Sequence, residues 1–137
     1  GRKEEATELF LAASIGNSQP AAAMYYNDQK PDKIFYQGLA LRKLGREEEA
    51  CGRFNNLISY GEKHLYDVFK MDYFAVSLPD LQIWEDDMNK KNRIHCNYLM
   101  ALGHLGLGNN EKAMKYFNIA AEMDNNHQGV QIHQKMI

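Results

Sequence analysis

The sequence has little proline, little cysteine and no excess of charge, and each shortage excludes a class of protein. Three prolines in 137 residues leave long stretches in which a helix can run without interruption. The two cysteines, Cys51 and Cys96, have neither metal-ligand spacing nor the number that a disulfide framework needs, so we expect buried thiols in a reducing compartment. The formal net charge of −2 provides no basic surface for a nucleic-acid backbone. These shortages predict a cytoplasmic protein that does not bind nucleic acid.

Long apolar runs are also missing. A membrane-spanning helix needs about eighteen or more consecutive apolar residues, and no stretch of the sequence approaches this length. Hydrophobic residues make up 45% of the chain and charged residues 25%, which is ordinary for a globular protein. The composition therefore predicts about one globular domain and no association with a membrane.

What is present is helical periodicity. Apolar residues recur at spacings of three and four, as in the stripe Ile34, Leu41 and Leu44, and no convincing strand-like alternation occurs. Proline is tolerated in the first turn of a helix, because the N–H that it lacks has no partner within the helix there. The prolines stand where helices can begin: Pro20, Pro31 and Pro79. The expected fold class is all-α.

One short phrase occurs three times: GRKEEA at residues 1–6, GREEEA at 45–50 and, in looser form, GNNEKA at 108–113. In each copy an alanine ends the phrase and an aromatic residue follows four positions later. The pairs are Ala6 with Phe10, Ala50 with Phe54, and Ala113 with Phe117. A small residue lets two helices cross closely, and the ring one turn further on fills the space that opens beyond the crossing. The phrase therefore predicts helix pairs that pack in one repeated way.

This pattern resembles the tetratricopeptide (TPR) repeat, which combines a small residue on its first helix with Ala-x3-Phe on its second. Gly38 and Ala101, each twelve residues before the marker alanine, supply the small residue. Two full units are expected, at residues 31–62 and 94–127. Residues 1–16 would be the second helix of a repeat whose first helix is missing, so we expect the chain to be an excerpt of a longer protein.

The units are unevenly spaced, since Gly1, Gly45 and Gly108 are 44 and 63 residues apart instead of multiples of about 34. We expect a short extra helix within 17–30 and a degenerate helix pair within 63–93, with helices at 65–77 and from about 85 to 105 around a break at 78–81. Residues 128–137 would form a capping helix. The expected fold is an irregular TPR-like solenoid of antiparallel helix pairs, with about seven to eight helices.

Four longer phrases carry a closer resemblance: YYNDQ, FYQGLALRKLGREEEA, DYFAVSLPD and HCNYLMALGHLGLGN. They look like the C-terminal TPR region of large bacterial proteins that carry an upstream galactose-mutarotase-like β-sandwich domain of unknown function. Those proteins are associated with carbohydrate metabolism. The resemblance implies a bacterial origin, and it implies either an upstream domain or a glycan site as the context of this chain.

The residue types that carry catalysis do not form a recognisable motif. The five histidines are His64, His95, His104, His127 and His133, and none belongs to an HExxH zinc site. Adjacent His95 and Cys96 would point about 100° apart on a helix, which is unsuitable for a catalytic dyad. His127 and His133 are six residues apart and would point to different sides of a helix. We therefore expect structural histidines, no metal, no cofactor and no enzymatic activity.

The acidic run WEDDMNKKNR has the same plain reading. It lacks the alternating oxygen ligands and the central glycine of a calcium-binding loop. Asp86 with Lys90, and Asp87 with Lys91, have the four-residue spacing of ion pairs on an exposed helix face. We expect a solvated surface here. The glycines of GHLGLG at 103–108 are likewise expected to end a helix, because no strand precedes them.

Binding is the better class of function, and the TPR resemblance indicates where to look, because first helices line the concave face of a TPR array. The groove residues that it implies are Asp32, Phe35, Leu39, Arg42, His95, Tyr98 and Leu102. Their apolar members predict a groove filled by a helix, a loop or a neighbouring domain. The alternative is that the chain's own segment 65–84 fills it. The lysine and asparagine that clamp a C-terminal carboxylate in some TPR domains are absent from the matching positions.

Three hypotheses about function follow. The first is a scaffold that binds a partner protein or the upstream domain of its own chain. The second is an accessory module that contributes to a carbohydrate-binding site, with Tyr73, Phe74 and Trp84 as the candidate aromatic surface. The third is weak self-association through the first helix, residues 3–13.

Overall fold

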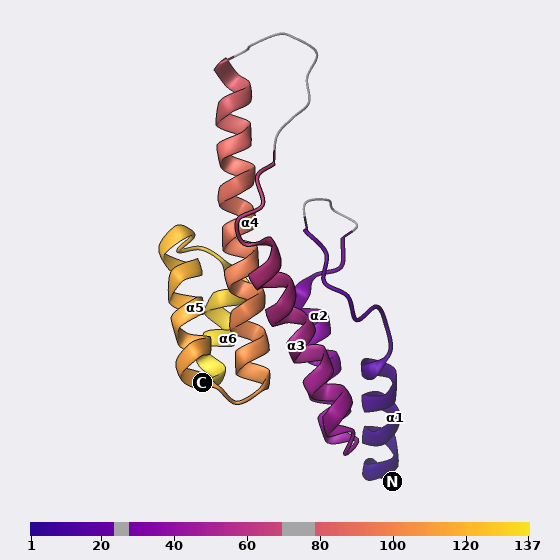
Figure 1. Ribbon diagram of the computed structural model, residues 1–137. Helices are drawn as coiled ribbons and strands as arrows, with labels where there is room; N and C mark the ends of the chain where they lie inside the picture. The colour runs from indigo at the N-terminus through magenta and orange to yellow at the C-terminus, as the bar shows by residue number, and fades with distance from the viewer. Residues whose placement is uncertain (24–27, 70–78) are drawn as a thin grey trace.

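The structure, a computed structural model, describes residues 1–23, 28–69 and 79–137, and the side chains of 79–86 lie outside this description. Within these ranges it contains six α-helices, one turn of 3-10 helix and no strand, which confirms the all-α prediction (Figure 1). The described helices are fewer than the seven to eight expected. They are α1 (Arg2–Ser14), α2 (Pro31–Lys43), α3 (Glu47–His64), α4 (Pro79–Gly106), α5 (Asn110–Met123), α6 (Gln128–His133) and the 3-10 turn η1 (Gln134–Met136).

The helices pack mainly on their neighbours in the chain. Helix α1 contacts α2, α2 contacts α3, α3 contacts α4, and α4 contacts α5. Helices α2 and α4 also touch, and α6 lies against α4 and α5. The two termini consequently lie on opposite sides of the array, with α1 and α5 as its flanks and the first turns of α4 projecting beyond it (Figure 1).

The repeated glycine phrase forms the same turn twice. After α2, the Arg46 amide donates to the Leu41 carbonyl over 2.9 Å, and after α4 the Asn109 amide donates to the His104 carbonyl over the same distance. This six-to-one hydrogen bond needs a left-handed residue just before the donor, a conformation that glycine adopts without strain. Gly45 and Gly108 provide it, with φ of +75° and +78°. The glycine of the repeated phrase therefore specifies the turns that join α2 to α3 and α4 to α5.

The alanine and phenylalanine that follow the repeated phrase in α3 and α5 belong to the hydrophobic core. Ala50, Phe54, Ala113 and Phe117 are all fully buried. In α1, by contrast, the matching Ala6 and Phe10 are only half-buried. The burial that Ala-x3-Phe predicts is found in α3 and α5, whereas α1 presents much of its surface to solvent.

Glycines let the central helices approach closely. A Cβ added to Gly38 of α2 would lie 2.4 Å from the Phe54 ring, and one added to Gly106 of α4 would lie 2.1 Å from the same ring. A Cβ on Gly103 would lie 2.6 Å from the backbone oxygen of Phe54, and one on Gly61 would lie 2.7 Å from that of Cys96. Side chains at these positions would push α3 away from α2 and α4.

The short helix expected within 17–30 is not found at residues 17–23 or 28–30, and its remaining residues lie outside the described part. Side chains from distant elements hold this segment in an irregular path. Gln37 donates to the Asn17 carbonyl over 3.2 Å, Asn56 donates to the Ser18 carbonyl over 3.1 Å, and His95 binds the Ala21 carbonyl at 2.8 Å. Because these carbonyls are satisfied by tertiary contacts, the helical preference of the alanines is overridden.

Helix α4 begins six residues earlier than expected, at Pro79 instead of about Glu85. Proline fits the first position of a helix, and neither glycine nor another proline interrupts the sequence from Asp80 to Leu102. Residues 79–81 of the expected break therefore begin the helix, and residue 78 lies outside the described residues. Of the helix expected at 65–77, residues 65–69 are not helical and 70–77 lie outside the described residues.

Candidate binding cleft

A cleft of about 1440 Å³ opens where the first turn of α2, the middle of α4 and helix α6 converge. The chain before α2 and the loop before α6 complete its walls. Lys33 from α2, His95 from α4 and Ile132 from α6 are among the side chains that line it. The cleft thus combines cationic, anionic and apolar groups from three helices on one concave side.

Helix α4 provides the floor of the cleft through His95 and Tyr98. The His95 Nε2–H donates to the Ala21 carbonyl at 2.8 Å, which ties the chain before α2 to α4. Burial lowers the pKa of His95, so its ring is neutral near pH 7 and its Nδ1 is an acceptor. Tyr98 is almost fully buried, and burial raises the pKa of its hydroxyl. These two residues form a neutral, hydrogen-bonding surface.

Helix α6 is attached to the rest of the array through the buried ring of His133. Its Nδ1 lies 2.7 Å from the Gly129 carbonyl and 3.0 Å from the Tyr98 hydroxyl, and its Nε2 lies 3.0 Å from the Tyr36 hydroxyl. A carbonyl can only accept, so Nδ1 carries the hydrogen and the Tyr36 hydroxyl donates to Nε2 in the neutral ring. The ring also meets Phe35 edge-on, with centroids 5.5 Å apart. One histidine therefore joins α6 to both α2 and α4.

His127 approaches the same tyrosine from the loop before α6. Its ring centroid lies 4.7 Å from that of Tyr98, and that of His133 lies 5.9 Å from it. The expectation that His127 and His133 point to different sides is wrong, because His127 precedes the helix and is not subject to its periodicity. Sequence reasoning missed this convergence, although the predicted capping helix at 128–137 was a signal that the tail packs on the array.

The predicted groove residues are separated by the structure into three groups. Asp32, His95 and Tyr98 line the cleft. Phe35 and Leu102 are fully buried in the core, and Leu39 is half-buried against it, so these three do not provide an open apolar surface. Arg42 lies elsewhere, at the other end of α2. The His133 ring of α6 packs on Phe35. Most of segment 65–84 lies outside the described residues and side chains, so the alternative that it fills the groove stays a prediction.

Asp32 is distinctive among the lining residues. It stands at the second position of α2, and its side-chain oxygen Oδ1 is buried without a hydrogen-bond partner among the described residues. A buried carboxylate oxygen without a donor is costly. Because this oxygen is shielded from solvent, it is an unsatisfied group behind the cleft wall and not a contact offered to a bound molecule.

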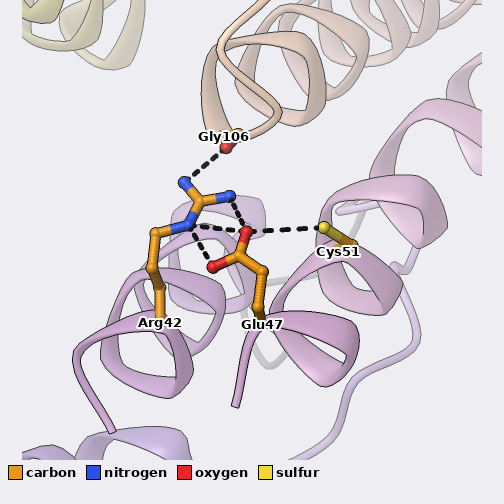
Figure 2. Close-up of polar contacts among 4 residues, drawn as sticks. All are labelled: Arg42, Glu47, Cys51 and Gly106. Carbon is orange, nitrogen blue, oxygen red and sulfur yellow. Dashed lines mark hydrogen bonds and ion pairs between the residues drawn. The ribbon is translucent and has the colours of Figure 1, made fainter. Parts of the chain in front are cut away.

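Arg42 links α2 to α3 and α4 and does not line the cleft (Figure 2). Its guanidinium donates to both carboxylate oxygens of Glu47, at 2.7–3.0 Å, and to the Gly106 carbonyl at the end of α4, at 2.7 Å. It also covers the Phe54 ring at 5.1 Å. The guanidinium holds the pKa of Glu47 below its usual range, chiefly through the hydrogen bonds. The Cys51 thiol contacts the same carboxylate at 3.6 Å.

The two cysteines differ in their surroundings. Cys96 is fully buried, and burial raises the pKa of its thiol to about 12. Cys51 is half-buried, so the prediction of a buried thiol is confirmed for Cys96 and wrong for Cys51. A thiol as poorly acidic as that of Cys96 cannot act as a nucleophile near neutral pH.

Two further predictions concern the surface. Lys91 pairs with Asp87 at 3.0 Å, as the spacing predicts, whereas the Asp86 side chain is not described. Tyr73 and Phe74 lie outside the described residues, as does the side chain of Trp84, so the aromatic surface stays a prediction. Among the described residues no three histidines, cysteines or carboxylates gather as a metal site, and no helix there has the length and apolar character to cross a bilayer.

Comparisons with family models and solved structures do not assign the chain to a family. No protein-family model matches the chain, and no solved structure matches it.

Proposed function

We propose that this chain is a non-catalytic interaction scaffold, made of TPR-like helix pairs, that holds a partner protein or another domain of its own polypeptide in the cleft between α2, α4 and α6. The observation that carries the proposal is the cleft itself. Its volume of about 1440 Å³ accommodates a polypeptide segment, and three helices contribute to its walls.

The character of the walls supports a polypeptide ligand. Lys33 presents an ammonium donor, His95 presents an acceptor nitrogen, and Ile132 leaves 57% of its surface exposed. A peptide offers N–H groups, carbonyls and apolar side chains together, and so it can use all three.

A non-catalytic role is supported by the engagement of the polar groups nearby. The Nε2 of His95, the Nδ1 of His127 and the Nδ1 of His133 each contact the backbone of this chain. Rings held in this way position the chain before α2, the loop before α6 and α6 itself. The glycan alternative depends on aromatic rings exposed at the cleft, and Tyr98, which lines it, is buried. Its other candidate rings, Tyr73, Phe74 and Trp84, lie outside the described side chains.

The proposal is tested by a matched pair of substitutions in quantitative affinity enrichment. Ile132→Asp places a charge on the cleft wall, and Leu9→Asp places one on α1, where Leu9 leaves 64% of its surface exposed outside the cleft. Both positions tolerate a charge without loss of core packing. The proposal predicts a partner that wild type and Leu9→Asp retain and Ile132→Asp loses. A partner lost by Leu9→Asp instead would refute the cleft as the binding site.

Self-association has one specific observation in its favour. Leu9, Leu11 and Ile15 leave 64%, 45% and 77% of their surfaces exposed along and just after α1. If α1 pairs with a second copy, the mass measured by sedimentation rises with concentration for wild type and remains that of a monomer for Leu9→Asp. A monomeric wild type at high concentration excludes this second function.

A further inference from the structure

Helix α6 begins with an unusual capping group. The residue before the helix is His127, and its Nδ1 accepts a hydrogen bond from the Val130 amide at 3.2 Å. Serine, threonine, aspartate and asparagine usually provide this acceptor, and none of them changes its charge between pH 5 and 8. Histidine does. Because α6 is six residues long, this single cap is a large part of what holds its first turn together.

The cap requires a neutral imidazole. The lone pair of Nδ1 must be free to accept, so the hydrogen of the ring is on Nε2. Protonation places a hydrogen on Nδ1, where it faces the Val130 N–H, and the hydrogen bond is lost. The positive charge would then also lie at the positive end of the helix dipole.

The charged and titratable groups around His127 come from every neighbouring element. They are Asp124 on its own loop, His133 on α6, and His95 and Tyr98 on α4. The other charged residues that line the same cleft are Asp28, Lys30, Asp32, Lys33 and Lys91. Burial lowers the pKa of His127, and His133 lowers it further, whereas the Asp124 carboxylate opposes both. The folded protein therefore favours the neutral ring.

We propose that α6 is a pH-sensitive latch on the cleft, in which protonation of His127 removes the cap of α6 and releases the helix from α2 and α4. At neutral pH the cap and the His133 contacts hold α6 against Tyr36 and Tyr98. In acid the first turn of α6 unwinds, and the wall that carries Ile132 moves away. The release itself stands independently of any partner, whereas its effect on partner binding rests on the proposed function.

Hydrogen exchange of the chain alone tests the latch without a partner. The comparison is between segment 128–137 and the core segment 113–120 at pH 7.5 and pH 5.5, corrected for the intrinsic pH dependence of exchange. The expected result is a loss of protection of roughly fivefold in 128–137 at pH 5.5, the usual effect of losing an N-cap, with 113–120 unchanged. His127→Asn keeps an acceptor that does not titrate and should abolish the pH effect. His95→Gln, which removes another histidine of the cleft and keeps a donor for the Ala21 carbonyl, should leave it intact.

Three outcomes would overturn the latch: equal protection of 128–137 at both pH values, the same loss in His127→Asn, or a pKa of His127 above the ordinary 6.5 in an NMR titration. If His127→Asn loosens α6 already at pH 7.5, His127→Asp supplies a second acceptor that stays unprotonated at pH 5.5, and it should restore protection at both values. If segment 128–137 loosens in acid but the chain captures no partner, the proposed function alone is refuted. If segment 128–137 is equally protected at both pH values and a partner is captured equally at both, the latch alone is refuted.

Discussion

The close approach of α3 and α4 predicts opposite effects for one substitution at two glycines. Gly103 of α4 faces α3, where an added Cβ would lie 2.6 Å from the Phe54 carbonyl oxygen and 2.5 Å from Ile58 Cγ1. Gly52 of α3 is exposed, and an added Cβ would meet nothing within 4 Å. Alanine favours a helix over glycine by about 0.8–1.0 kcal/mol at either position. The difference between the two sites is therefore the steric cost alone.

That cost follows from the atoms that block the methyl group. One of them is a backbone oxygen within a helix, which cannot move without moving α3. Forcing a methyl group into a well-packed site costs about 1–3 kcal/mol, and the upper half of that range applies where backbone must shift. After the helical preference of alanine is subtracted, Gly103→Ala should destabilise the protein by about 1–2 kcal/mol. Gly52→Ala should stabilise it by about 0.5–1 kcal/mol.

Urea unfolding followed by circular dichroism measures both effects as shifts of the midpoint at constant slope. Gly61→Ala provides a repeat of the test on the other helix, since its Cβ would lie 2.7 Å from the Cys96 oxygen. If Gly103→Ala stabilises the protein as Gly52→Ala does, then α3 and α4 are not packed as closely as described, and the account of the core is wrong.

Three further predictions concern the core and the titrating groups. Phe54→Ala should cost about 3–5 kcal/mol of unfolding free energy, because helices in contact through glycines cannot collapse onto the cavity; a loss below 1 kcal/mol would contradict the packing. Under native conditions an alkylating reagent should modify Cys51 and leave Cys96 untouched until the protein is unfolded, as mass spectrometry of the tryptic peptides would establish; early modification of both would contradict the burial. Burial lowers the pKa of His95 and His104, so the unfolded state takes up protons first as the pH falls below 6.5, and the urea midpoint should be lower at pH 5.5 than at pH 7.5. Replacing both histidines with glutamine should reduce the difference between the two urea midpoints. If that difference is unchanged, it arises from other titrating groups and the prediction is wrong.

The parts of the fold that could be predicted are those determined by local chemistry. The connections at Gly45 and Gly108 are specified locally, by a glycine that adopts a left-handed conformation and the charged helical turn that follows it. Alanine and phenylalanine four residues apart specify which face of α3 and α5 is buried. These features depend on neighbours in the sequence, and so the sequence alone was enough to place them.

The parts that were missed depend on contacts between distant residues. The alanines after Pro20 favour a helix by propensity. Side chains of Gln37, Asn56 and His95 nevertheless bind three carbonyls of this segment, those of residues 17, 18 and 21, and keep it irregular. The role of Arg42 depends on the carbonyl of Gly106, which is 64 positions away. The cleft itself was only partly predicted, since His127 and His133 reach it through a loop whose direction no periodicity specifies.

Site-specific photo-crosslinking tests the central claim most directly. A benzophenone amino acid at Lys33, on the wall of the cleft, is compared with the same group at Asn55, an exposed position of α3 that does not line it. In cells that naturally produce the chain, the account predicts a defined protein adduct, within the polypeptide or with a partner, from position 33 and none from position 55. An adduct from position 55 alone, or none from position 33, would contradict the account that this cleft is where the protein acts.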